Sequence, residues 1–194
     1  MTWQDMGFVR RDTYQLEELD AEKLNLRLRE QKVLTKRKQK RKRENGMDAK
    51  SAEKIVKNLE NFGGIFSADQ LENVKILDLP VSLLILDDGH WISVFIGERS
   101  LEIMDSAGFT TNEKSNKHLL RFLCAHSYGK ELTITPQLQK EDSSDCGKYA
   151  TTFLCVRTVA AVHLKNFAKL FSDDFEENSK IIDEIFATVK QFYS

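Results

Sequence analysis

The chain has 194 residues, of which 41% are hydrophobic and 9% aromatic, so it has enough apolar material to build the core of one compact domain. This composition excludes a wholly disordered chain, and the two prolines and nine glycines exclude collagen-like and low-complexity chains. The 29 basic and 30 acidic residues leave a net charge of −1, so the molecule as a whole is not a basic nucleic-acid-binding protein.

A dense basic segment near the N-terminus divides the chain. Residues 32–43 read KVLTKRKQKRKR and contain eight basic residues, and the remaining chain carries 21 basic against 30 acidic residues. We therefore expect a charged, partly helical extension over residues 1–45 and a folded domain over residues 46–194. A solvated tail or a nuclear-import signal is one interpretation of the basic segment, and non-specific binding of DNA phosphates is the other. The candidate DNA-binding residues are Lys36, Arg37, Lys38, Lys40, Arg41, Lys42 and Arg43.

Two helices and three strands are expected before residue 130. Helical spacing of apolar residues after Gly46 predicts a helix that ends at Gly63-Gly64. The apolar runs at 81–86, 91–96 and 101–104 predict buried strands, and the last two are separated by a short turn that makes them a hairpin. Helical spacing returns over residues 113–127.

The rest of the chain predicts one more strand and two more helices. Residues 131–138 alternate like a strand, 147–164 read as one long buried helix, and apolar residues between 181 and 192 predict a terminal amphipathic helix. No internal repeat is visible. This order of elements indicates an α+β domain rather than a regular βαβ succession.

The cysteines and the apolar runs indicate the kind of cellular compartment in which the protein works. Cys124, Cys146 and Cys155 cannot form a closed set of disulfides, and none stands in a CxxC pair typical of zinc or redox sites, so we expect a reducing compartment and no metal. The chain starts without a secretory signal pattern, and its longest apolar run, residues 83–86, is too short to span a bilayer. We therefore expect a soluble protein that is not secreted and has no membrane partner.

His90 and Asp105 are expected to lie side by side. His90 directly precedes the strand over 91–96, and Asp105 ends the returning strand of the predicted hairpin, so antiparallel pairing brings them together. Taken singly, His90 would be a structural or surface histidine and Asp105 a turn-capping aspartate. As a pair they have the residue types of a base and the group that orients it.

Cys146 is the candidate nucleophile. It follows Ser143-Ser144-Asp145 at the start of a predicted helix, where unpaired amide groups and the helix dipole lower the pKa of a thiol. Gly147 leaves room for a substrate backbone to approach. Cys124 and Cys155 lie within apolar helical stretches and fit the usual fate of a free cysteine, a small buried hydrophobe.

A glutamine before the cysteine is the candidate oxyanion donor. Gln139 lies seven positions before Cys146, and its side-chain amide together with the Cys146 backbone N–H would supply the two donors of an oxyanion hole. Gln137 lies on the same face of a strand, and the spacing does not decide between the two glutamines.

The order His, Asp, Gln, Cys differs from that of papain-like enzymes, in which the cysteine comes first. It resembles the family of the adenovirus maturation protease (adenain) and the proteases specific for SUMO and other ubiquitin-like proteins. The resemblance covers roughly residues 50–165. The motifs that carry it are His90-Trp91, Asp105-Ser106, Gln139 and Asp145-Cys146-Gly147.

This resemblance implies an adenain-like fold, with a central mixed sheet flanked by helices and the catalytic cysteine at the N-terminus of a buried helix. It implies a cysteine endopeptidase that accepts glycine around the scissile bond, with Trp91 and Gly147 lining the substrate channel and no cofactor required for the chemistry. Trp91 has an alternative role as an ordinary core aromatic.

The compact size favours a viral maturation protease of the kind carried by virophages and related large DNA transposons. Its substrates would be capsid or other virion precursor proteins, cleaved in the virion or in the host cytoplasm or nucleus. Activation by DNA or by a peptide stays open. Two alternatives use the same residues: a protease that deconjugates a ubiquitin-like protein, and a protein acetyltransferase.

Overall fold

The computed structural model describes residues 46–109 and 117–193. The predicted extension over 1–45, with its basic segment, lies outside the described residues. Among the residues described, no helix is both long and apolar enough to cross a lipid bilayer.

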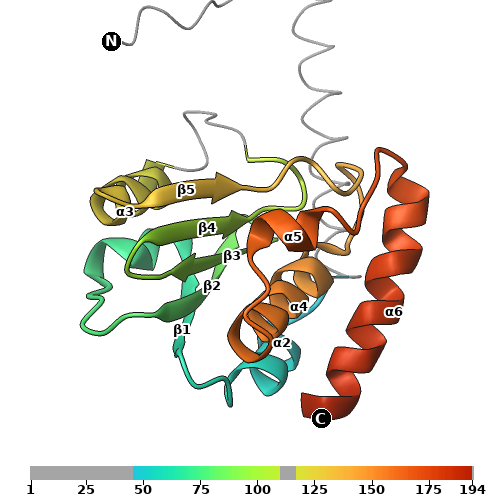
Figure 1. Ribbon diagram of the computed structural model, residues 1–194, viewed down its shortest axis with the longest axis horizontal. Helices are drawn as coiled ribbons and strands as arrows, with labels where there is room; N and C mark the ends of the chain where they lie inside the picture. The colour runs from blue at the N-terminus through green and yellow to red at the C-terminus, as the bar shows by residue number, and fades with distance from the viewer. Residues whose placement is uncertain (1–45, 110–116, 194) are drawn as a thin grey trace, which may run out of the picture. The chain divides into compact units, whose positions relative to one another are not determined.

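A five-stranded mixed sheet forms the centre of the domain (Figure 1). A central mixed sheet is expected, but its first strand, β1, is not predicted. The outer pairs, β1 with β2 and β4 with β5, are parallel, whereas β2, β3 and β4 form an antiparallel meander. The sheet has the order β1-β2-β3-β4-β5, and its strands are β1 (Phe62–Ser67), β2 (Val81–Asp87), β3 (His90–Ile96), β4 (Ser100–Met104) and β5 (Glu131–Ile134).

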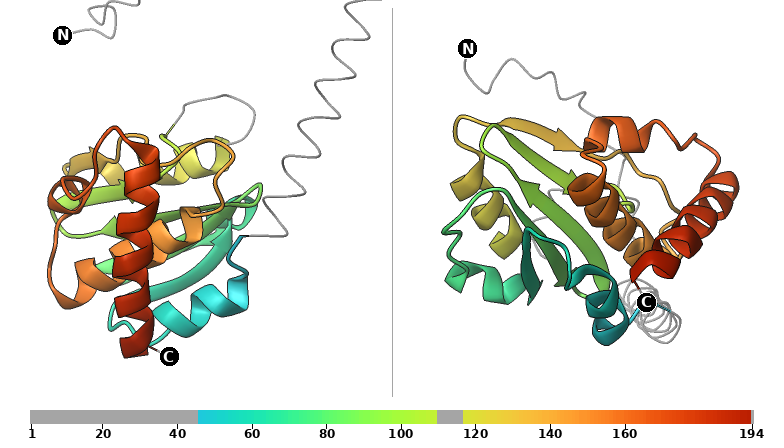
Figure 2. Two further views of the ribbon diagram at one scale, coloured as in Figure 1. Left: turned by 90° about the vertical axis from the view of Figure 1, so that its right-hand side faces the viewer. Right: turned by 60° about the horizontal axis from the view of Figure 1, so that its bottom comes forward.

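Helices flank both faces of the sheet because its strands are apolar on both sides. Trp91 and Phe95 of β3 point into a core shared with the helices of one face, while Ile92 and Val94 between them point into a second core on the other face. Figures 1 and 2 show α4 lying against the sheet with α6 outside it. The first face holds α2 (Ala49–Val56), α4 (Cys146–Val159), α5 (Leu164–Ala168) and α6 (Phe175–Tyr193), and the second holds the 3-10 helix η2 (Ala68–Asn73) and α3 (Lys117–Ser127).

The turn between β2 and β3 fixes the register that positions His90. Its two residues, Asp88 and Gly89, have φ angles of 45° and 79°, the left-handed pair that a two-residue type I′ hairpin requires. Asp-Gly is a preferred sequence for this turn because both residues tolerate positive φ. Consequently Asp87 pairs with His90 at the end of the hairpin.

The first predicted helix is shorter than expected, and the predicted stop is wrong. Gly63 and Gly64 lie within β1 rather than at the end of a helix. A Cβ on Gly63 would lie 2.6 Å from Cγ2 of Val81, which is too close for any other residue to fit without a shift. Glycine is therefore needed where β1 packs closely against the start of β2.

Two later elements also differ from the prediction. The long helix over 147–164 is in fact two helices, α4 and α5, because buried Glu102 of β4 accepts hydrogen bonds from both Arg157 Nε (2.9 Å) and the Leu164 backbone N–H (2.6 Å). The strand over 131–138 ends at Ile134, two residues before Pro136, which has no N–H for a sheet hydrogen bond.

Candidate active site

His90 and Asp105 meet as the hairpin predicts. The pairing of Ser93 with Met104 and of Ile96 with Leu101 places both residues at the same end of β3 and β4. His90 Nε2 lies 2.7 Å from Oδ1 of Asp105, which is itself buried. The same oxygen accepts the Ala107 backbone N–H at 3.1 Å, so the carboxylate is held in place by the chain that follows it.

Cys146 is the first residue of α4 and is buried. The first N–H groups of a helix have no intrahelical acceptor, so the start of α4 presents donors and the positive end of the helix dipole at this cysteine. The other two cysteines have different surroundings. Burial raises the pKa of Cys155 to about 12, as expected for an inert thiol, whereas Cys124 is exposed, so the expectation that it is buried is wrong.

The ring of His90 interacts with both Asp105 and Cys146. Burial lowers its pKa, but hydrogen bonding and charge interaction with Asp105 and with Cys146 outweigh that effect and raise the pKa to about 9. Nε2 is the atom that contacts Asp105. A histidine held in this way stays protonated at neutral pH, which favours a thiolate at Cys146.

Gln139, rather than Gln137, has the surroundings of an oxyanion donor. Gln139 is buried, and its Oε1 accepts a hydrogen bond of 3.0 Å from the Ser106 hydroxyl, while its Nε2 has no partner among the described residues. Gln137 is exposed and donates from Nε2 to the Gln139 carbonyl at 3.0 Å. The structure therefore favours Gln139 as the oxyanion donor, and the side chain of Gln137 supports the backbone of Gln139.

Residues of α6 hold the loop that carries Gln139, and the sequence analysis missed them. Asn178 is fully buried, and its Nδ2 donates to the carbonyls of Leu138 (3.1 Å) and Ser172 (2.8 Å), while its Oδ1 accepts the Ser172 N–H (2.9 Å). No local sequence pattern marks such a residue, because its partner Leu138 lies 40 positions earlier in the chain.

A second group from α6 secures the residue that precedes the cysteine. Asp145 accepts hydrogen bonds of 2.8 Å from the hydroxyls of Ser143 and Ser179 and pairs with Lys148 at 2.8 Å. Burial raises the pKa of Asp145, but the bonds from Lys148, Ser143 and Ser179 outweigh it and leave the pKa below its usual value. The Asp145 carboxylate, which precedes Cys146 in the chain, is therefore ionised, and the positive charge of Lys148 balances it.

A small channel of about 140 Å³ leads to Cys146, with Trp91 as one of its walls. Trp91 is buried, and its Nε1 donates a 2.7 Å hydrogen bond to the Met47 carbonyl, which ties the segment before α2 across the channel. Gly147 does not leave open space for substrate, contrary to expectation. A Cβ there would lie 2.7 Å from Cβ of Met47 and 3.1 Å from Cδ1 of Trp91, so the glycine allows α4 to start close to these channel residues.

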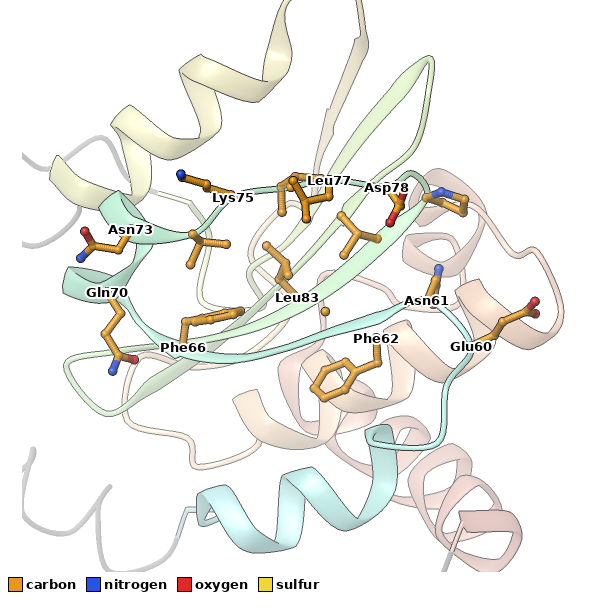
Figure 3. Close-up of a pocket in the computed structure, with 15 residues that line it drawn as sticks. Glu60, Asn61, Phe62, Phe66, Gln70, Asn73, Lys75, Leu77, Asp78 and Leu83 are labelled. Carbon is orange, nitrogen blue, oxygen red and sulfur yellow. The ribbon is translucent and has the colours of Figure 1, made fainter.

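A separate hollow of about 770 Å³ lies along β1, an edge strand of the sheet (Figure 3). It is lined by β1, by the segment around Leu77 and by Val81 at the start of β2, whereas His90 follows the end of β2. It takes no part in the arrangement around Cys146. Among residues 46–109 and 117–193, no group of three or more histidine, cysteine or acidic side chains is placed to hold a metal ion.

The four side chains predicted from the sequence thus supply a thiol, an imidazole, a carboxylate and a buried amide donor around the start of α4. Such a set can form a thiolate, attack a carbonyl carbon and stabilise the oxyanion that results. This is acyl-transfer chemistry, in which the acyl group passes first to sulfur and then to water or to another acceptor.

Comparisons with known proteins find only a distant likeness. No protein-family model matches the chain, and no curated protein sequence matches it. One solved structure, described as "Crystal structure of the de-sumoylating protease", is similar over 79% of this chain and 77% of its own, with 17% sequence identity and a TM-score of 0.35. Because this likeness is so distant, the function proposed below rests on the geometry of the site.

Proposed function

We propose that this protein is a cysteine peptidase in which Cys146 is the nucleophile and His90 the general acid and base. Asp105 orients the imidazole, and Gln139 stabilises the oxyanion together with the N–H groups at the start of α4. The observation that carries the proposal is the position of the His90 ring, which is bonded to Asp105 at 2.7 Å and has its pKa raised to about 9 by Asp105 and Cys146 against the effect of burial.

The reaction has two stages. The Cys146 thiolate attacks the scissile carbonyl carbon, a C–S bond forms, and the negative charge moves to the carbonyl oxygen. Protonated His90 then gives its proton to the leaving amine as the C–N bond breaks, which leaves a thioester. A water molecule loses a proton to His90 and attacks the thioester, and the release of the carboxylic acid restores the thiolate and the imidazolium.

The channel limits the substrates that reach the thiol. With a volume of about 140 Å³, and with Trp91 and Met47 joined by a hydrogen bond, it fits an extended backbone with small side chains. We therefore propose glycine or another small residue beside the scissile bond.

Activity against glycine-containing peptides tests this proposal. Wild type should cleave a quenched fluorescent peptide with glycine on the acyl side of the scissile bond. Cys146→Ala should show no measurable turnover, and His90→Ala should lose about 10³-fold or more in kcat/KM. Cys124→Ala changes an exposed cysteine on α3 and is the matched control. Normal turnover by folded Cys146→Ala would rule out the mechanism.

The sequence resemblance supports a narrower proposal, cleavage of capsid or other virion precursor proteins in the virion or in the host cytoplasm or nucleus. Three substrates separate it from its alternatives. A virion precursor cut at a glycine supports maturation, a ubiquitin-like fusion cut at its terminal glycine supports deconjugation, and Cys146-dependent labelling of protein by acetyl-CoA supports acetyl transfer. Adding DNA or the cleaved peptide to the first assay tests activation by either.

A further inference from the structure

A second hollow opens between α2 and α6, next to the channel that leads to Cys146. Its volume is about 780 Å³, and it shares Gly46 and Met47 with the channel. Its apolar lining includes Ile55 from α2 and Phe186 from α6. The hollow and the channel are therefore neighbours, with Met47 in the lining of both.

Lysines surround this hollow. Four of them line it, and none of its described lining residues is acidic. The charge of Lys148 is compensated locally, since it pairs with Asp145 at 2.8 Å and also with Asp183. We call this hollow the lysine groove. Its four lysines are Lys54 on α2, Lys57 at the C-cap of α2, Lys148 on α4 and Lys190 on α6.

Two of these lysines are available for a ligand. Lys54 and Lys57 are exposed, and within residues 46–109 and 117–193 neither forms an ion pair. They lie one turn apart on the same helix, three positions from each other, so both ammonium groups can reach one bound chain. Their charge is not used to hold the fold together, which leaves it free to attract an anionic partner.

We propose that the lysine groove binds an acidic segment of the protein substrate, a few residues from the scissile bond. The apolar lining and the position next to the channel favour a peptide over a nucleic acid. The exposed Lys54 and Lys57 favour glutamate or aspartate in that peptide. The inference rests on the proposed function, because it takes the segment in the groove and the segment in the channel to be parts of one substrate.

Binding to the full-length Cys146→Ala protein tests the groove without the need for turnover. The probe is a fluorescein-labelled peptide with a glycine-rich end followed by a block of glutamates, and the comparison peptide has glutamine in place of each glutamate. Fluorescence anisotropy at low salt should show tighter binding of the acidic peptide. Lys54→Glu with Lys57→Glu should weaken binding of the acidic peptide about tenfold and leave the glutamine peptide unchanged.

The matched control reverses the charge of two exposed lysines away from the groove, Lys165→Glu with Lys169→Glu. Lys165 lies on α5, and Lys169 directly follows that helix. The control keeps the net charge and the N-terminal basic segment of the test variant, so any difference between the two variants comes from the groove. Equal weakening in both variants would overturn the proposal. So would a result in which duplex DNA, and not the acidic peptide, loses affinity in the Lys54 and Lys57 variant.

Turnover by the wild type distinguishes this inference from the function on which it rests. Charge-dependent binding in the groove with no cleavage of any glycine peptide would contradict the peptidase and leave the groove in place. Cleavage of the acidic and the glutamine peptides with the same kcat/KM would contradict the groove and leave the peptidase in place.

Discussion

At the scale of single residues, the candidate site depends on buried polar groups that hold one another in position. Asp105 fixes Nε2 of His90 and is itself fixed by the Ala107 N–H, while Ser106, the residue between them, fixes the amide of Gln139. Three consecutive residues after β4 therefore orient both the base and the oxyanion donor. A shift of this short segment would misplace two groups of the candidate site at once.

The raised pKa of His90 predicts the pH dependence of Cys146 alkylation. With a pKa of about 9 in the folded protein, His90 is charged throughout the neutral range and loses its proton as the pH rises through about 9. We expect Cys146 to react with iodoacetamide at pH 6 roughly tenfold faster than an ordinary thiol of pKa about 8.5, allowing for the lower nucleophilicity of a stabilised thiolate. Mass spectrometry at several pH values locates and quantifies the modified cysteine.

The variant His90→Ala is the control for this measurement. Its Cys146 should react several-fold more slowly at pH 6 than in wild type, because the imidazolium partner is gone. Cys124, which is exposed, reports the reactivity of an ordinary thiol in the same sample. If Cys146 reacts at the same rate with and without His90, the two residues are not a catalytic pair.

Substitution of the two glutamines separates their roles. We expect Gln139→Ala to lower kcat about 10²–10³-fold with little change in KM, because it removes a donor that acts on the oxyanion. Gln137→Ala should change kcat less than about fivefold, because its amide contacts only the Gln139 carbonyl from an exposed position. Equal losses from the two substitutions would show that Gln139 is not the specific donor.

At the scale of secondary-structure elements, the sequence predicts the parts of the fold that have local signals. The apolar runs are sufficient to predict the hairpin of β3 and β4, which brings His90 to Asp105. By contrast, β1 contains two glycines and lacks an apolar alternation. The break between α4 and α5 depends on Glu102, which is 62 positions from Leu164, and no local pattern reports a contact at that distance.

The terminal helix α6 is a structural support for the site as well as a cover for the core. Its apolar residues Ile182 and Val189 pack into the same core as α4, which amphipathic spacing predicts. Its polar contacts to the site are not predictable in this way, because Asn178 and Ser179 reach Leu138 and Asp145 in another part of the chain. The site is therefore assembled from residues well beyond the motifs that identify it.

Asn178→Ala should destabilise the fold. The substitution leaves the Ser172 N–H and carbonyl without the Asn178 amide and removes one of two hydrogen bonds to the Leu138 carbonyl, which also accepts from the Tyr149 hydroxyl. We expect this to lower the free energy of unfolding by about 2–4 kcal/mol. Urea denaturation measures the change. Asn166→Ala, an exposed position on α5, is the matched control and should change stability by less than about 0.5 kcal/mol. If Asn178→Ala lowers the free energy of unfolding no more than Asn166→Ala does, Asn178 contributes little to stability.

At the scale of the whole molecule, charge is distributed unevenly along the chain. Residues 1–45 contain 13 basic and 8 acidic residues, whereas residues 46–194 contain 16 basic and 22 acidic residues. The net charge of −1 therefore combines a positive N-terminal part with a negative remainder. The net negative charge of the remainder disfavours DNA binding, so we expect affinity for DNA to come from the N-terminal part.

Neutralising the basic segment in the full-length chain tests this expectation. Changing the seven basic residues from Lys36 to Arg43 to glutamine should abolish retention on duplex DNA at low salt. In wild type, log K should fall with log salt concentration by about 0.9 for each phosphate that the segment neutralises. Cleavage of a short glycine peptide should be unchanged, because the substituted residues precede the described domain. Retention of DNA with an unchanged salt slope would place the affinity elsewhere, and a matching loss of peptidase activity would show that the segment acts on the active site as well.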